Sequence, residues 1–260
     1  MFNMFKYILR EVKSAFKKKM ALIMLICIIA ICFVANLAVM AFKLIYGSNI
    51  DGVLGSNVLA FASWCFPIPY LATILFSDLV FGTVYPNPHI KDNVTKNLSR
   101  TGIYFGKFLG ALVVSLCYMI IAFVVLLVTT RIFHSDITSY DVSLFVENML
   151  VAAPLWIAGV SFGTMFLFMF DVKKKAYIAF YIVTLVIPRF IMLFAAEPFS
   201  LPPFIAVRKI LMSQSFGHIP YIADPERSVP FIVCEGIVYT IISCIIGIIV
   251  YNKKEFSKSK

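Results

Sequence analysis

The sequence predicts an all-α membrane protein with six transmembrane helices, an N-terminal amphipathic interfacial helix and both termini in the cytoplasm. Hydrophobic residues make up 61% of its 260 residues and charged residues only 14%, which leaves too little polar surface to cover a water-soluble core. Six apolar stretches are each long enough for a helix to cross a hydrocarbon layer of about 30 Å. Lysine and arginine are concentrated in alternate connections between these stretches. The apolar stretches predict the fold, and the charge pattern predicts its orientation.

Residues 1–19 are expected to form an interfacial elbow helix that leads into the first transmembrane helix. Large apolar side chains recur every three or four residues, which places them on one helical face. Cationic side chains occupy the neighbouring rows, where they would meet anionic lipid headgroups. The alternative interpretation is a solvated basic tail. The apolar set is Phe2, Phe5, Leu9, Val12 and Phe16, and the cationic set is Lys6, Arg10, Lys13 and Lys17.

Residues 20–260 are expected to form a six-helix transmembrane domain. The second apolar stretch contains Pro67 and Pro69, and each proline removes a backbone donor and clashes with the preceding turn. A kink or local unwinding is therefore predicted there, and Pro154 lies inside the fourth stretch. The expected helices are 21–42, 57–81, 103–130, 144–170, 176–194 and 229–251.

Basic residues set the expected orientation, because cytoplasmic segments retain positive charge. Most of the 23 lysines and arginines fall in residues 1–19, after the second helix, in residues 173–175 and in the C-terminal tail. Both termini and the 82–102 loop are therefore predicted to be cytoplasmic, and the 195–228 loop external, in a multi-pass protein of the cell membrane. A nucleic-acid partner is excluded, because the cations border apolar helices and form no continuous stripe.

Metal, disulfide and nucleotide sites are not expected in this chain. The six cysteines lie in apolar stretches, where a thiol behaves as a small hydrophobe, and the three histidines lie in different loops. Residues 102–107 resemble a phosphate-binding loop but are one residue short and lack the hydroxyl residue after the lysine. Small residues at every fourth position predict close helix packing instead. These small faces are Gly102, Gly106 and Gly110, then Gly159 and Gly163, and finally Ser243 and Gly247.

The predicted cytoplasmic loop 82–102 carries the most specific pattern in the sequence. Asp78 lies about one helical turn before a Gly-Thr pair, prolines then interrupt the chain, and residues 89–98 can form a short helix. A Ser-Arg pair follows, and a lysine opens the third helix. The candidate coupling residues are Asp78, Gly82, Thr83, Lys96, Ser99, Arg100 and Lys107.

This pattern resembles the ABC-2-type permeases, the transmembrane subunits of bacterial ATP-binding-cassette exporters. In that family an acidic residue precedes a Gly-Thr pair at the cytoplasmic end of helix two, and a Ser-Arg pair and a lysine mark the entry to helix three. The six-helix layout with an elbow helix also fits, so the resemblance covers the whole chain at the level of architecture. Two features depart from the pattern, namely aspartate at position 78 where glutamate is commoner, and the prolines at 86 and 88.

The resemblance implies that this chain is not an enzyme and carries no cofactor of its own. A separate cytoplasmic ATPase subunit would bind ATP and Mg²⁺, and the 82–102 loop would transmit its movement to the helices. Lys96 and Arg100 would face carboxylates on that subunit, and Asp78 would anchor the loop. Two plainer interpretations stay open. Asp78 can reach headgroup water at a helix end, and Arg100 and Lys107 can reflect ordinary positive-inside retention.

Arg189 and Glu235 are charges inside the fifth and sixth predicted helices. Both lie roughly 8 to 9 Å from the outer boundary at 1.5 Å per residue, and consecutive antiparallel helices are usually neighbours. The hypothesis for them is an ion pair that fixes the contact between the two helices, with substrate binding as the alternative role.

The expected cargo is amphiphilic, a peptide or a lipid-like molecule, because the chain is rich in phenylalanine and poor in buried charge. A second permease, identical or different, is expected because six helices are too few to enclose a path alone. An ATP-independent channel or secondary transporter is the alternative function, although the two halves of the chain show no internal similarity. A membrane enzyme would need a cluster of His, Asp, Glu or Ser near one membrane face, and the sequence offers none.

Overall fold

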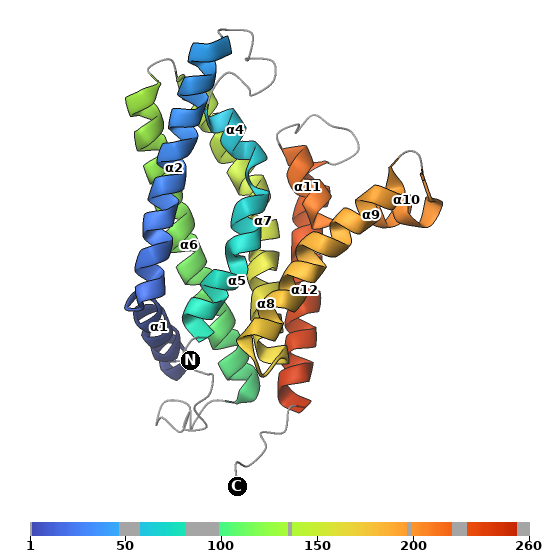
Figure 1. The fold of residues 1–260 in the computed structure, drawn as a ribbon. Coiled ribbons are helices and arrows are strands. Elements are labelled where there is room, and N and C mark those ends of the chain that lie inside the picture. Colours follow the sequence, from blue (N-terminus) through green and yellow to red (C-terminus); the bar gives the residue numbers. More distant parts are fainter. Residues whose placement is uncertain are drawn as a thin grey trace.

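The computed structural model describes residues 2–46, 58–81, 99–134, 137–196, 199–219 and 228–253 (Figure 1). Within these ranges the regular structure is helical and no strand occurs. Five helices are long and apolar enough to cross a membrane, and the number rises to six if the bent pair α4 and α5 forms one span. The chain is therefore a multi-pass membrane protein with five or six spans.

The observed helices follow the predicted stretches and extend a few residues beyond most of them. The elements are α1 (Phe2–Phe16), α2 (Lys19–Tyr46), α4 (Val58–Trp64), α5 (Pro67–Phe81), α6 (Arg100–Phe133), α7 (Ser139–Met169), α8 (Lys173–Tyr181), a π-helix (Ile182–Val186), α9 (Ile187–Ala195), α10 (Pro202–Arg208), α11 (Met212–His218) and α12 (Val229–Lys253).

The predicted proline kink is confirmed between α4 and α5, whose axes differ by 63°. Pro67 occupies the first position of α5, where a missing backbone N–H costs no helical hydrogen bond. The break exposes the carbonyl of Phe66, and the indole of Trp156 on α7 donates a hydrogen bond to it at 3.1 Å. Pro154 also lies within α7, and that helix continues past it to Met169.

Two long helices begin at capping residues. The Ser99 hydroxyl accepts a hydrogen bond from the Gly102 amide at 3.0 Å, which starts α6. At the start of α7, the Thr138 hydroxyl accepts from the Asp141 amide at 3.2 Å, and the Asp141 carboxylate accepts from the Thr138 amide at 2.9 Å. This reciprocal capping box fixes the beginning of α7.

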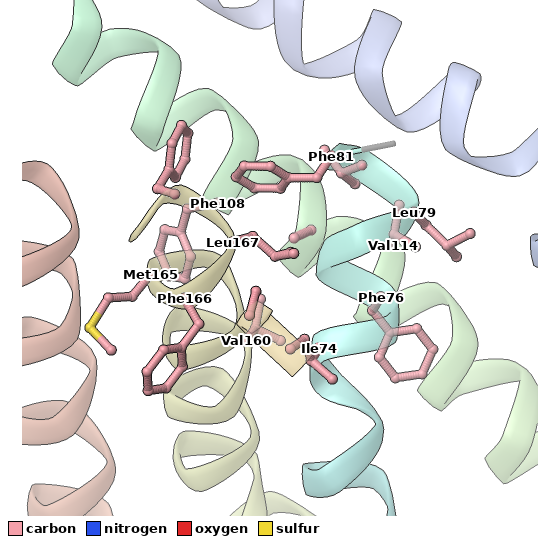
Figure 2. Close-up of a cluster of buried hydrophobic side chains, with 14 of the residues drawn as sticks. Ile74, Phe76, Leu79, Phe81, Phe108, Val114, Val160, Met165, Phe166 and Leu167 are labelled. Atoms are coloured by element: carbon pink, nitrogen blue, oxygen red, sulfur yellow. The ribbon is translucent and has the colours of Figure 1, made fainter. Parts of the chain in front are cut away.

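Helix α7 is the centre of the bundle and packs against α5 and α12 (Figure 1). Of its most apolar stretch 67% is buried, against 17% for α2. Figure 2 shows part of one buried apolar cluster, in which side chains from α5, α6 and α7 lie close together. A second cluster fills the half of the bundle farther from α1, around α4, α7 and α11. Outer helices such as α2 and α12 expose many large apolar side chains, as lipid-facing surfaces do.

Glycines of the predicted small faces lie where helices meet. A Cβ added to Gly106 would stand 2.6 Å from the ring of Tyr7 on α1, and one added to Gly159 would stand 2.7 Å from the ring of Tyr70 on α5. A Cβ on Gly163 would stand 3.0 Å from the Ile74 backbone. The prediction of close packing at these positions is confirmed.

The span that begins with α8 contains a feature that the sequence reading did not anticipate. Its middle turn is a π-helix that ends two residues before Pro188. Because proline has no N–H and clashes with the preceding turn, a locally wider turn is a common accommodation. Beyond it, α9 and α10 lean away from the bundle, whereas α11 returns to lie beside α12 (Figure 1).

Candidate functional site

The candidate site is the end of α5 and the beginning of α6, which flank residues 82–98. It lies at the end of the bundle that also holds α1 and the last turn of α12 (Figure 1). The structure describes Asp78, Ser99, Arg100 and Lys107 there. The other candidate coupling residues, Gly82, Thr83 and Lys96, lie outside the described residues.

Two lysines donate hydrogen bonds to carbonyls in the last turn of α5. Lys18, in the turn between α1 and α2, donates to the Leu79 carbonyl. Lys107, in the second turn of α6, donates to the Val80 carbonyl at 2.9 Å. The last four carbonyls of a helix lack intrahelical partners and carry the negative end of the helix dipole. A lysine ammonium donates a hydrogen bond to such a carbonyl, and its positive charge is attracted to the negative end of the dipole. The two lysines therefore hold the end of α5 against α1 and α6.

Lys107 also forms an ion pair with Glu11 of α1. Its Nζ lies 2.6 Å from Glu11 Oε2, and the side chains are only 2% and 14% exposed. The rings of Tyr7 and Phe81 flank the ammonium at 6.0 and 5.8 Å from their centroids. A buried charge needs its partner, because loss of one member leaves the other uncompensated. The elbow helix is thus fixed to α6 through one side chain.

Asp78 is held by the first turns of α8. Lys173 Nζ lies 2.7 Å from one carboxylate oxygen, and the Tyr177 hydroxyl donates to the other at 3.2 Å. Asp78 therefore contacts protein groups and does not extend alone into headgroup water. Together, Lys18, Lys107 and Lys173 form what we call the lysine clasp, which joins the α1–α2 turn, α6 and α8 to the last turns of α5.

The pKa of Lys18 reflects the charges that surround it in the lysine clasp. Burial lowers the pKa of the Lys18 ammonium below its ordinary value, and the positive charge of Lys107 lowers this pKa further. The carboxylate of Asp78 acts in the opposite direction. Like charges are therefore close enough in the lysine clasp to interact, and the carbonyls and carboxylates of its partners offset that repulsion.

Arg100 connects the start of α6 to the end of α12. Its guanidinium donates to the Asn252 carbonyl at 2.9 Å, which satisfies a group in the last turn of α12. The Asn252 amide in turn lies 3.5 Å from the Thr101 hydroxyl. The helix ends that flank residues 82–98 are consequently both held, the end of α5 by the lysine clasp and the start of α6 by Ser99 and Arg100.

Sequence reasoning missed three residues of this site. Lys18 and Lys173 were counted only as part of the positive-inside pattern, and Glu11 was not singled out. Glu11 did carry a signal, because it is the only acidic residue among residues 1–19 and follows Tyr7 by four positions. A lone acid at that spacing indicates a face that differs from the cationic one.

The structure does not bring Arg189 and Glu235 together, so the predicted ion pair needs correction. Arg189 lies on the exposed side of α9, which leads away from α12 (Figure 1). Glu235 is buried in α12 and accepts a hydrogen bond from the Ser215 hydroxyl of α11. Chain order predicted adjacent helices, but α7 packs against α12 instead and α11 covers the acidic side chain.

Replacing Ser215 with alanine is expected to lower the free energy of unfolding by about 1 to 3 kcal/mol, because the buried Glu235 loses a donor. Glu235→Gln keeps an acceptor oxygen and is expected to change stability less. Thermal unfolding of both variants in detergent measures the difference. Equal stability of Ser215→Ala and the wild type would show that this bond does not hold α11 against α12.

The contacts at the site are ion pairs and hydrogen bonds that join one helix to another. Within the described residues, no group of three or more His, Cys, Asp or Glu side chains is arranged to hold a metal ion. Among the described carboxylates, Glu11, Asp78 and Glu235 contact lysines or hydroxyls, and they lie on three different helices, α1, α5 and α12. Comparison of the chain with known protein families and with curated proteins finds no match.

Proposed function

We propose that this chain is the transmembrane permease subunit of an ABC exporter of the ABC-2 type. It would move an amphiphilic substrate, a peptide or a lipid-like molecule, out of the cell across the cell membrane. ATP, with its Mg²⁺, is hydrolysed on a separate cytoplasmic ATPase subunit, and both termini of this chain face that subunit. The observation that carries the proposal is the lysine clasp at the last turns of α5, where residues 82–98 begin.

The arrangement suits transmission of force. A displacement applied to residues 82–98 reaches α5 and α6 directly, because these helices join the two ends of the segment. The lysine clasp then passes the displacement to α1 and α8 through Glu11, Lys18 and Asp78. Hydrogen bonds with a charged partner are stronger than neutral ones. The helices that they join are therefore expected to move together. Substrate would pass between this chain and a second permease, because aromatic and aliphatic side chains fill the bundle interior.

One observation favours the alternative, an ATP-independent channel or secondary transporter. Glu235 is a buried carboxyl within a spanning helix, and such groups often mark ion or proton pathways. Its partner is a hydroxyl from the short helix α11. The two functions differ in their energy source, since only the exporter depends on ATP hydrolysis by an ATPase subunit.

The decisive experiment purifies the tagged chain gently from its native membrane and identifies the proteins that accompany it. We expect an ATPase subunit. Asp78→Asn should then reduce the stimulation of ATP hydrolysis by the permease about tenfold, because α8 loses a charge-assisted contact of about 1.5 kcal/mol with α5.

Asp171→Asn is the matched control, since Asp171 is exposed and lies close to Lys173 in the chain. It should leave the stimulation unchanged. A chain that purifies alone and transports without ATP would replace the exporter proposal with the channel or secondary transporter. Equal effects of the two substitutions would remove the coupling role from the lysine clasp.

A further inference from the structure

Helix α1 has three distinct faces, and only one of them packs against the bundle. Tyr7 and Ala15 are buried on that face, and Glu11 between them reaches Lys107. Burial raises the pKa of the Tyr7 phenol, which is consistent with a closely packed contact. The other two faces are exposed, one of them cationic and the other apolar.

The cationic face forms an open groove. It is lined by Leu9, Arg10, Lys13, Ser14 and Lys17. The three basic residues follow one another at spacings of three and four, so their side chains gather along one row of the helix. All three are exposed, and the Ser14 hydroxyl lies among them as a further donor. Such a set of donors matches the oxygens of a phosphate group.

The apolar face adjoins this groove. Phe5, Leu9 and Phe16 are 62%, 51% and 41% exposed, and Leu9 belongs to both the groove and the apolar face. The membrane-spanning helix α2 begins at Lys19, only two residues after Lys17. The Lys17 end of the groove therefore lies next to the start of this spanning helix.

We propose that this groove binds the headgroup of an anionic phospholipid, with its acyl chains lying against Leu9 and Phe16. Charge complementarity favours an anion, and the exposed apolar side chains favour an anion that carries hydrocarbon. An acidic protein surface would match the cations but not the neighbouring large apolar side chains. The proposal does not depend on the exporter function.

Lipid binding at this groove bears on the lysine clasp because α1 carries both. Lys13 and Lys17 lie on the exposed side of the helix, and Glu11 lies on the side that holds Lys107. A lipid that fixes α1 at the membrane surface also fixes Glu11 against Lys107. Anionic lipid is thus expected to stabilise the packing of α1 on α6.

The test measures phosphatidylglycerol binding to the purified full chain in phosphatidylcholine nanodiscs by native mass spectrometry. Lys13→Gln combined with Lys17→Gln should weaken binding about 20-fold, since each lysine near an anionic surface contributes roughly fivefold in affinity. Thermal unfolding in phosphatidylcholine alone should be unchanged, because both side chains are exposed. Addition of phosphatidylglycerol should stabilise the wild type and not this variant.

Lys174→Gln combined with Lys175→Gln is the matched control, because it removes the same charge from two exposed lysines in the first turn of α8. It should weaken binding less than twofold. Equal weakening by the two double variants would overturn the proposal and indicate attraction by net charge alone. Unchanged lipid binding in the Lys13 and Lys17 variant would also overturn it, and loss of an acidic protein partner from that variant would then assign the groove to the partner.

Discussion

Lys107→Met is expected to lower the free energy of unfolding by about 3 to 5 kcal/mol, because it leaves a buried carboxylate without its partner. The Lys107 ammonium meets Glu11 at 2.6 Å and the Val80 carbonyl at 2.9 Å, and its side chain is almost fully buried. Methionine fills a similar volume but donates to neither acceptor. Chemical unfolding in mixed micelles measures the loss, and limited proteolysis of α1 should show that this helix detaches first.

A second substitution distinguishes the contribution of the ion pair to stability from the contribution of side-chain packing. Glu11→Leu in the Lys107→Met background should recover most of the loss, since apolar replacement of both members of a buried pair is often neutral. The recovery is incomplete because the Val80 carbonyl still lacks its donor. Lys175→Met, at an exposed position, should change stability by less than about 0.5 kcal/mol. If Lys107→Met resembles this control, the ion pair does not hold α1 in place.

The positions of the helices were predictable because apolar length and proline chemistry act locally. A run of apolar residues predicts a spanning helix wherever it occurs, and Pro67 interrupts one whatever surrounds it. The small faces of α6 and α7 were predictable for a related reason. Glycine at every fourth position leaves a shallow strip that only another helix fills, as Gly106 and Gly159 do with Tyr7 and Tyr70.

The partners of the charged residues were not predictable, because they depend on which helices become neighbours. Glu11 and Lys107 are separated by 96 positions, and neither position in the sequence indicates the other. Arg189 and Glu235 illustrate the opposite error. Equal depth and consecutive order predicted a pair, but Pro188 and the π-helix precede a segment that leads away, and α11 takes the position beside Glu235.

The lysine clasp and the glycine contacts have complementary effects on the bundle. The clasp joins α1, α5, α6 and α8 at one end through charged contacts, which tolerate small adjustments of long side chains. Gly163 of α7 and Gly236 of α12 instead meet the backbones of α5 and α7, and backbone atoms cannot adjust in this way. A displacement at the clasp should therefore move α5, α7 and α12 as a unit, and this unit depends on the closest contact between a glycine and the backbone of another helix.

That contact joins Gly236 of α12 to Pro154 of α7. A Cβ at position 236 would stand 2.6 Å from the Pro154 carbonyl carbon and 2.7 Å from its oxygen, and these are backbone atoms that cannot rotate away. Gly236→Ala is therefore expected to destabilise the fold by about 2 to 3 kcal/mol, despite the better helix propensity of alanine. Chemical unfolding in mixed micelles measures this loss.

Gly217→Ala provides the contrast, because nothing lies within 4 Å of the added methyl group in the short helix α11. Only helix propensity acts there, so this variant should be neutral or up to about 1 kcal/mol more stable. Gly163→Ala should fall between the two, since its closest contact is the Ile74 backbone at 3.0 Å. If Gly236→Ala were as stable as Gly217→Ala, α7 and α12 would be able to separate without cost. Movement would then not pass from the lysine clasp to α12 through α7.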